Sequence, residues 1–339
     1  MDFWSPGGRA DSVVAEARAW LDGPDGVDLV VATSGSTGQP KRVRLARAAV
    51  LASVQASAAR LGSSGPWVLA LPPTYVAGLQ VVVRSLVAGH EPTLLERDGW
   101  PPGEGWFVSL VPTQLTRILD GAGGPGDLDA LRRAHTVLVG GGPVGATLRA
   151  RAAEAGVRTV ATYGSAETAG GCVYDGLPLD GVAVALGTGG RIRVAGPVLF
   201  RGYDGRPELT REVLVDGWFH TSDAGRLDED GRLAVIGRVD DVIVSGGLNV
   251  PGPAVAERLR AHPGVRGAEV LGVPDPEWGN RVVAFVVGGP DAAALRDWVA
   301  AAHPRAWAPR QVVRLGEIPL LENGKPDRQA LLRHPEIAR

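Results

Sequence analysis

Short apolar runs alternate with alanine-rich stretches along the first half of the chain. The apolar runs, bounded by glycine and proline, predict buried strands, and the alanine-rich stretches predict helices between them. The expected strands cover residues 27–34, 66–73, 105–112, 134–142 and 157–164. The expected helices cover residues 46–62, 78–90, 113–121 and 143–156. This βαβα order favours an α/β fold built on a largely parallel sheet.

The pattern changes after residue 176. Residues 190–203 and 231–238 have the alternation and glycine turns of antiparallel strands. A smaller unit is expected from about residue 241, with helices at 253–262 and 292–302, strands at 268–273, 281–289 and 311–316, and a last helix from Asp327. We therefore predict a large N-terminal domain with a parallel-rich sheet and a β-hairpin region over residues 1–239. A small α+β domain follows over residues 240–339.

Composition and charge are those of an ordinary globular protein. The 339 residues are 45% hydrophobic and 21% charged, with a net charge of −2. This balance favours neither a nucleic acid nor a membrane as partner. Cys172 is the single cysteine, so no internal disulfide can form, and the first 14 residues do not have the pattern of a signal peptide. We expect a cytoplasmic protein.

The stretch VVATSGSTGQPKRV, residues 30–43, is a candidate phosphate-binding loop. Its glycines leave backbone N–H groups open to an anion, its hydroxyls add donors, and Lys41 adds a positive charge. It is expected to connect a strand to a helix, and a flexible linker is the alternative. It is not a Walker A loop, because Pro40 stands where the second glycine should be. The candidate residues are Thr33, Ser34, Gly35, Ser36, Thr37, Gly38 and Lys41.

Asp223 and Arg238 are predicted to be partners on one hairpin. Asp230 and Gly231 form a turn signal, and the two residues lie at equal distances from it. In a symmetric register they would face each other across neighbouring antiparallel strands. A surface ion pair is the alternative interpretation.

A second glycine pattern suggests a different class of enzyme. Gly140, Gly142 and Gly145 match the G-x-G-x-x-G spacing of dinucleotide-binding proteins. Pro143 removes a backbone donor that a pyrophosphate would need, and the next expected strand ends without an acidic residue. An NAD-dependent oxidoreductase is therefore the more distant alternative.

Four stretches in one order resemble the acyl-adenylating superfamily of acyl-CoA ligases, peptide-synthetase adenylation domains and luciferases. TSGSTGQPK resembles its phosphate loop, and YGSAET (163–168) resembles its Tyr-Gly-x-Thr-Glu motif. Residues 217–250 resemble its ribose-binding and hinge region, and NGKPDRQAL (323–331) resembles its C-terminal lysine motif. The resemblance covers nearly the whole chain from about residue 28 and implies the two-domain fold of that superfamily, trimmed at its N-terminus.

The resemblance implies ATP, Mg²⁺ and CoA as cofactor and co-substrates. It assigns catalysis to Lys325, Glu167 and Arg238, with Glu167 also holding Mg²⁺, and Asp240 is the expected hinge. The implied nucleotide and CoA contacts are the loop residues above with Gly141, Gly142, Tyr163, Gly164, Ser165, Asp223, Arg238, Gly246 and Gly247. The implied acid-binding residues are Tyr75, Gly78 and Gly140.

Residues 71–80, 109–115 and 170–182 most resemble o-succinylbenzoate–CoA ligases of menaquinone biosynthesis. Tyr75, Ala166 and Leu248 depart from the usual pattern. Other adenylating enzymes remain as alternatives: an aryl or fatty acid CoA ligase, a carrier-protein loading enzyme, or a non-catalytic adenylate binder. Because only some 30 residues precede the phosphate loop, a homo-oligomer that covers exposed apolar surface is a further expectation.

Overall fold

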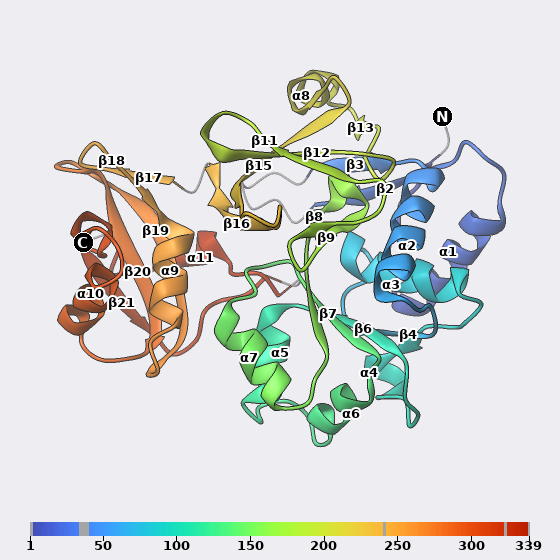
Figure 1. The fold of residues 1–339 in the computed structure, drawn as a ribbon, viewed down its shortest axis with the longest axis horizontal. Helices are drawn as coiled ribbons and strands as arrows, with labels where there is room; N and C mark the ends of the chain where they lie inside the picture. The colour runs from blue at the N-terminus through green and yellow to red at the C-terminus, as the bar shows by residue number, and fades with distance from the viewer. Residues whose placement is uncertain (1–2, 34–40, 240–241, 322–323, 338–339) are drawn as a thin grey trace.

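The computed structural model describes residues 3–33, 41–239, 242–321 and 324–337. A large unit built from three sheets is followed by a small unit with one sheet of its own (Figure 1). The expected α/β fold, with a large N-terminal and a small C-terminal domain, is confirmed. The expected boundary at residue 240 lies outside the described residues.

The central sheet of the large unit has the strand order β10-β9-β8-β7-β6-β4-β5. The strands β5, β4, β6, β7 and β8 are parallel, β9 is antiparallel to β8, and β10 is antiparallel to β9. Their bounds are β4 Trp67–Leu69, β5 Thr93–Leu94, β6 Phe107–Leu110, β7 Thr136–Val139, β8 Thr159–Ser165, β9 Gly170–Tyr174 and β10 Leu177–Pro178. The core strands are nearly continuous apolar runs because both faces of the sheet are covered.

Two groups of helices cover the central sheet. On one face lie α1 (Ala10–Asp22), α2 (Arg47–Leu61) and α3 (Val76–Val87), and on the other lie α5 (Pro112–Leu119), α6 (Asp127–Arg133) and α7 (Ala146–Glu154). The short helix α4 is Leu95–Asp98. Gly62 ends α2 in the left-handed conformation (φ 68°), as expected from its position after the last apolar residue.

A second sheet carries the flanks of the candidate phosphate loop. Its order is β1-β2-β3-β13, with bounds Phe3–Trp4, Asp28–Ala32, Arg42–Leu45 and Gly202–Tyr203. Because β2 and β3 pair in antiparallel fashion, the loop connects two strands of a hairpin. The expectation that it leads from a strand into a helix is wrong. The alternation in Arg42–Leu45, which buries Val43 and Leu45, makes this stretch a strand.

The third sheet has the order β11-β12-β15-β14, with β16 paired to β15. The bounds are β11 Ala183–Leu186, β12 Arg191–Ala195, β14 Leu214–Val215, β15 Trp218–Leu227 and β16 Leu233–Arg238, and α8 is Pro207–Val213. This sheet is antiparallel, as expected for the region after residue 176.

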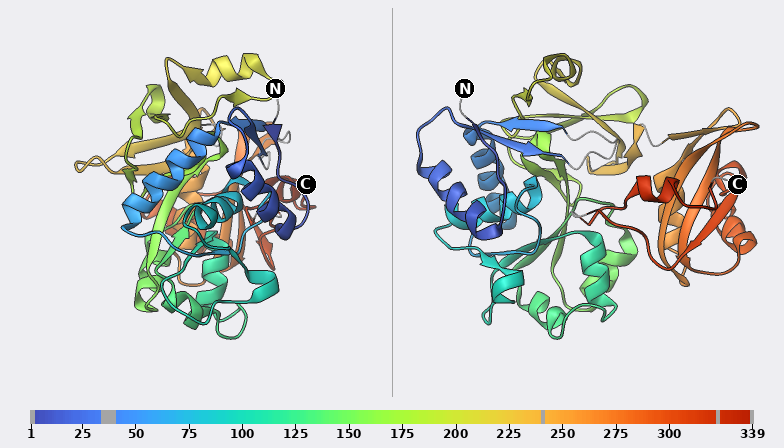
Figure 2. Two further views of the ribbon diagram at one scale, coloured as in Figure 1. Left: turned by 90° about the vertical axis from the view of Figure 1, so that its right-hand side faces the viewer. Right: turned by 180° about the vertical axis from the view of Figure 1, so that it is seen from behind.

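The small unit is a five-stranded sheet with helices on both faces. Its strands are β17 Val242–Ser245, β18 Leu248–Pro251, β19 Val265–Asp275, β20 Gly279–Gly288 and β21 Gln311–Leu315. Its helices are α9 Gly252–Arg260, α10 Ala292–Ala300 and α11 Arg328–Leu332. Seen from behind, the segment around α11 lies on the side of the small unit that faces the large unit (Figure 2).

The N-terminal end of the described chain leaves little apolar surface exposed. Val13, Ala17 and Trp20 of α1 are buried, and before Val87 only Phe3 is an exposed large apolar residue among those described. The homo-oligomer stays a prediction without support from this region. In the part of the chain that the structure covers, no helix is both long enough and apolar enough to cross a membrane.

Candidate active site

The predicted site residues of the large unit gather at one edge of the central sheet. Strands β4, β6, β7 and β8 are parallel, so their carboxyl ends meet at this edge, where α/β proteins bind ligands. Tyr75 and Gly78 follow β4, and the glycine turn 140–142 follows β7. Tyr163 lies in β8, and Glu167 lies in the short 3₁₀ turn Ala166–Thr168 that comes directly after it.

Three of the predicted glycines in the large unit are required by close packing. A Cβ added to Gly164 would lie 2.0 Å from the carbonyl oxygen of Gly170, and one added to Gly140 would lie 2.2 Å from Thr162 Oγ1. Gly78 packs against the carbonyl of Pro72 in the same way. These contacts give the glycines a role in shaping the edge of the sheet.

The flanks of the candidate phosphate loop are bonded to each other. The Thr33 N–H donates to the Lys41 carbonyl at 2.8 Å, and the Lys41 N–H donates to Thr33 Oγ1 at 3.0 Å. The Lys41 ammonium lies 5.2 Å from the centre of the Tyr203 ring. The candidate residues Ser34, Gly35, Ser36, Thr37 and Gly38 lie outside the described residues.

Asp223 and Arg238 are register partners on β15 and β16, which confirms the predicted pairing. The register is less simple than equal spacing implies. Near the turn, Gly225 pairs with Val235, whereas Ala224 pairs with Gly237, so Ile236 is an extra residue in β16. This β-bulge restores the alignment of Asp223 with Arg238.

Two tyrosine–carboxylate pairs lie in the site. The Tyr163 hydroxyl donates to Asp223 Oδ2, and the Tyr203 hydroxyl donates to Glu167 Oε1, both at 2.8 Å. Glu167 is 8% exposed, whereas Asp223 is half-buried. Burial and the neighbouring carboxylate raise the pKa of both tyrosines, so both hydroxyls keep their proton.

Lys325 of the small unit reaches this group of charges. A Cβ added to Gly141 would lie 3.8 Å from Lys325 Cε. The residue as a whole is exposed, yet the protein around its ammonium lowers the pKa of Lys325 by desolvation. The Asp223 carboxylate raises that pKa, the Arg238 guanidinium lowers it, and Glu167 raises it. The small unit therefore brings the Lys325 side chain beside Gly141 of the large unit, where the charges of two carboxylates act on it.

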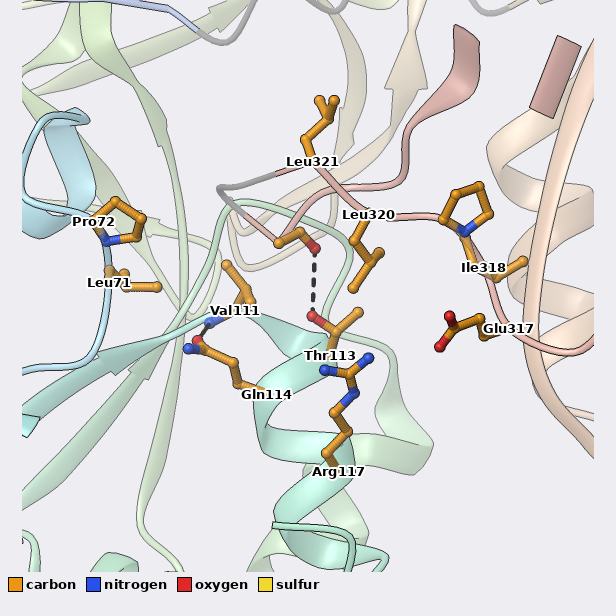
Figure 3. A pocket seen from close by; sticks show the side chains of 12 residues that line it. Leu71, Pro72, Val111, Thr113, Gln114, Arg117, Glu317, Ile318, Leu320 and Leu321 are labelled. Carbon is orange, nitrogen blue, oxygen red and sulfur yellow. Dashed lines mark hydrogen bonds between the residues drawn. The ribbon is translucent and has the colours of Figure 1, made fainter. Parts of the chain in front are cut away.

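A cavity of about 440 Å³ lies between α5 and the segment that precedes Lys325 (Figure 3). The Thr113 hydroxyl, at the start of α5, donates to the carbonyl of Gly324 at 3.4 Å. From the large unit the lining residues are Leu71, Pro72, Val111, Thr113, Gln114 and Arg117, and from the small unit they are Glu317, Ile318, Pro319, Leu320, Leu321 and Gly324. Residues 317–321 and Gly324, which precede Lys325, thus form one wall of the cavity.

Two predicted glycines lie away from this edge, in the small unit. Gly246 and Gly247 form the turn between β17 and β18, where a Cβ on Gly246 would lie 2.7 Å from the Trp278 ring. Gly142 packs near Pro112, and the Ser165 hydroxyl is buried without a hydrogen-bond partner among the described residues. Ala166 is buried in the core of the large unit. Asp240 is outside the described residues.

The model of the AMP-binding enzyme family matches residues 16–194, and that of the AMP-binding enzyme C-terminal domain matches residues 254–325. The chain belongs to the AMP-binding enzyme family. This confirms the predicted resemblance to the acyl-adenylating superfamily. The dinucleotide-binding interpretation of Gly140, Gly142 and Gly145 receives no support from these matches.

Two curated relatives of this AMP-binding enzyme are a CoA ligase and a CoA synthase by name. It is 41% identical to a probable 2-succinylbenzoate–CoA ligase of Mycobacterium tuberculosis, over 95% of this chain and 88% of the relative. It is 34% identical to a feruloyl-CoA synthase of Amycolatopsis sp, over 94% of this chain and 72% of the relative.

Solved structures of the family are similar in fold. The o-succinylbenzoate CoA synthetase of Bacillus subtilis, in complex with its acyl-adenylate intermediate, is 27% identical and aligns with a TM-score of 0.76, over 89% of this chain and 68% of that one. The same enzyme in complex with ATP and a magnesium ion is 26% identical, with a TM-score of 0.75, over 89% of this chain and 69% of that one.

Sequence reasoning missed Tyr203, which touches both Glu167 and Lys41. Its place in the site depends on the pairing of β13 with β3, which no local pattern shows.

The distribution of lysine is a signal in the sequence that was overlooked. Lys41 and Lys325 are the only two lysines among the 35 basic residues of the sequence. Because arginine supplies every other basic side chain, two lysines in two candidate motifs indicate positions that need a compact ammonium.

Proposed function

We propose that this protein is an AMP-forming ligase that joins 2-succinylbenzoate to CoA through an acyl-adenylate. The observation that carries the proposal is the position of Lys325. Its Cε lies 3.8 Å from a Cβ added to Gly141 at the carboxyl edge of the central sheet, where the charges of Asp223, Arg238 and Glu167 act on it. Family membership and the relatives named above support the same reaction.

In the first step, an oxygen of the acid's carboxylate attacks the α-phosphorus of ATP. The bond from that phosphorus to the bridging oxygen breaks, and pyrophosphate leaves. Negative charge accumulates around the α-phosphate, where the Lys325 ammonium stabilises it. In the second step, the CoA thiolate attacks the acyl carbon, a thioester forms, and AMP leaves with the electron pair of the broken C–O bond.

The other site residues take the roles that the family motifs assign. Thr33 and Lys41 belong to the loop that holds the phosphates, and the Ser165 hydroxyl supplies a nearby donor. Tyr163 and Gly164 border the nucleotide, and the Asp223 carboxylate accepts hydrogen bonds from the ribose diol beside Arg238. Gly246 and Gly247 reach the pantetheine only in the second step, after a rotation about Asp240.

The residues present fit a Mg²⁺ ion that ATP brings with it. Among the described residues no three His, Cys, Asp or Glu side chains gather as a metal cage. Mg²⁺ is usually held by one or two carboxylates, substrate phosphates and water, and Glu167 is a buried carboxylate at the end of β8. When bound, the ion would offset the negative charge of the phosphates.

The acid is proposed from the relatives and from the sequence around the cavity. Two of the three stretches that resemble o-succinylbenzoate–CoA ligases, 71–80 and 109–115, supply five of the six lining residues that come from the large unit. A volume of about 440 Å³ suits a small aromatic acid. A hydroxycinnamic acid such as ferulate is the second candidate, because the feruloyl-CoA synthase matches 94% of this chain.

ATP–pyrophosphate exchange with a panel of carboxylic acids tests the proposal, with CoA added afterwards. We expect 2-succinylbenzoate to give the highest kcat/KM and CoA to release AMP. A higher value for ferulate, benzoate or a fatty acid would replace the proposed acid. Exchange without CoA-dependent AMP release would favour a carrier protein as acceptor, and no exchange with any acid would contradict the enzyme. A cytoplasmic location and the domain boundary at residue 240 are part of the proposal.

A further inference from the structure

Tyr203 joins two parts of the site that are far apart in the sequence. It lies in β13, is 5% exposed, and packs edge-on against Phe200. Its hydroxyl donates to Glu167 Oε1 at 2.8 Å, and the Lys41 ammonium lies 5.2 Å from the centre of its ring. One side chain therefore contacts both groups that the proposed function assigns to the nucleotide's phosphates and metal.

We propose that Tyr203 is a positioning residue that orients the Glu167 carboxylate toward a divalent cation and steadies Lys41 beside it. This inference rests on the proposed function, because it assumes that Glu167 holds the cation of a metal–nucleotide complex. It adds a residue that none of the sequence motifs considered above contains.

The contact with Glu167 restricts a flexible side chain. A carboxylate has about four lone-pair positions, and the tyrosine hydroxyl uses one of them, so the others stay available to a cation. Fixing one oxygen selects one orientation of the glutamate among its rotamers. Partners of this kind behind a metal ligand are worth 10–100-fold in metal affinity or activity in general.

Strand β13, which contains Tyr203, pairs with β3, the strand that follows the candidate phosphate loop. Tyr203 is the register partner of Val43, two residues after Lys41. Asp204, the next residue, accepts from Arg42 Nε at 3.0 Å. The buried carboxylate of Asp28 accepts from Arg44 at 2.8 Å, which ties β2 to β3. This anchoring gives the Tyr203 ring a fixed position under the Lys41 ammonium.

The test compares two tyrosines that each donate a hydroxyl to a site carboxylate. The variants are Tyr203→Phe, which removes the donor to Glu167 and keeps the ring, and Tyr163→Phe, which removes the donor to Asp223. Calorimetry without any acid measures the dissociation constant of ATP with excess Mg²⁺ and, separately, with EDTA. The dissociation constant with EDTA divided by the dissociation constant with Mg²⁺ measures how much the metal tightens nucleotide binding.

We expect Tyr203→Phe to reduce this ratio about tenfold, as for loss of a partner behind a metal ligand. Tyr163→Phe should weaken ATP with and without Mg²⁺ equally and leave the ratio within twofold of the wild type. An unchanged ratio in Tyr203→Phe would overturn the inference and leave Tyr203 a packing residue. Because no acid is present, this result does not depend on which acid, if any, supports exchange.

Two further variants keep the inference testable if Tyr203→Phe folds poorly. Glu167→Asp shortens the side chain by one methylene, which moves the carboxylate away from the Tyr203 hydroxyl. This variant should reproduce the reduced ratio. In a Glu167→Gln background, Tyr203→Phe should add no further reduction, because the two residues act as a unit. A full additional loss in that background would show that Tyr203 acts by another route and would also overturn the inference.

Discussion

The pairs Tyr163–Asp223 and Tyr203–Glu167 have the same hydrogen bond and different surroundings. Both tyrosine hydroxyls donate at 2.8 Å, and the charges of both carboxylates act on Lys325. Asp223 lies half-buried at the open end of a hairpin with Arg238 opposite, whereas Glu167 is buried and accepts from the Tyr203 hydroxyl.

This difference suits two kinds of ligand. A half-buried carboxylate can exchange water for the hydroxyls of a sugar, because part of its surface stays accessible to the solvent. A buried carboxylate keeps its charge at a cost unless a donor or a cation compensates it, so it suits a metal ion that stays close to the phosphates. On the proposed function, the site would separate ribose recognition from phosphate and metal recognition, and both carboxylates would act on Lys325.

Removing the cation that both carboxylates face should have the largest effect. Lys325→Ala should slow adenylate formation about a hundredfold to a thousandfold, as for loss of one strong electrostatic contact in a transition state. Pre-formed acyl-adenylate should react with CoA at a near-normal rate, because that step builds no charge at the same place. Single-turnover assays of each half-reaction measure both rates. Equal loss in both would indicate misfolding, and no loss in either would leave Lys325 a surface residue.

Asp223→Ala should have the next largest effect, and it should remove only the contact with the ribose. Loss of hydrogen bonds to a charged acceptor corresponds to about 1–3 kcal/mol, which predicts weaker ATP binding by the variant. Calorimetric binding of ATP with and without Mg²⁺ measures it. The metal's contribution should stay at the wild-type level, because Glu167 and Tyr203 are untouched. A reduced metal contribution in Asp223→Ala would contradict the separation of the two pairs.

Much of this architecture follows from local patterns, and the exceptions have physical reasons. The parallel strands and α2 with its Gly62 cap are visible in apolar runs and glycine positions. Arg42–Leu45 was not predicted as a strand because its alternation is short and directly precedes an alanine-rich helix, although the buried Val43 and Leu45 follow the period of two. The helix Ala10–Asp22 was also missed, although Val13, Ala17 and Trp20 have helical spacing.

Local sequence patterns predict the site only in part, as they do the fold. The Asp223–Arg238 pair was predicted from equal distances to a turn, but the ladder reaches it through the extra residue Ile236. A bulge of this kind depends on packing between strands and leaves no local mark in the sequence. Tyr203 could not be found by any pattern within its own segment, because its partners Glu167 and Lys41 come from two other segments. Contacts between distant segments are set by the tertiary fold.

The pH dependence of the first step should distinguish Lys325 from an ordinary lysine. Its pKa is lowered from 10.5, chiefly by desolvation, so the ammonium loses its proton at a lower pH than a solvated lysine would. The kcat/KM for ATP, which reports the ionisation of groups in the free enzyme, should therefore fall as the pH rises toward the lowered pKa of Lys325. In Lys325→Arg this alkaline decline should vanish, because guanidinium stays protonated. A decline that persists in Lys325→Arg would assign it to another group.

The smallest expected effect is a difference in stability between the Tyr163→Phe and Tyr203→Phe variants. Tyr163→Phe removes a donor from a half-buried carboxylate that water can still reach and that has Arg238 opposite, so we expect a loss of less than about 1 kcal/mol in the free energy of unfolding. Tyr203→Phe leaves the buried Glu167 carboxylate without its hydroxyl donor, and a loss of about 1–3 kcal/mol is expected. Urea denaturation of both variants without nucleotide measures the difference. Since both changes remove one oxygen and keep the ring, size cannot account for it. If the two variants lose equal stability, burial does not distinguish the pairs, and the contrast between a solvent-facing ribose carboxylate and an enclosed metal carboxylate loses its energetic basis.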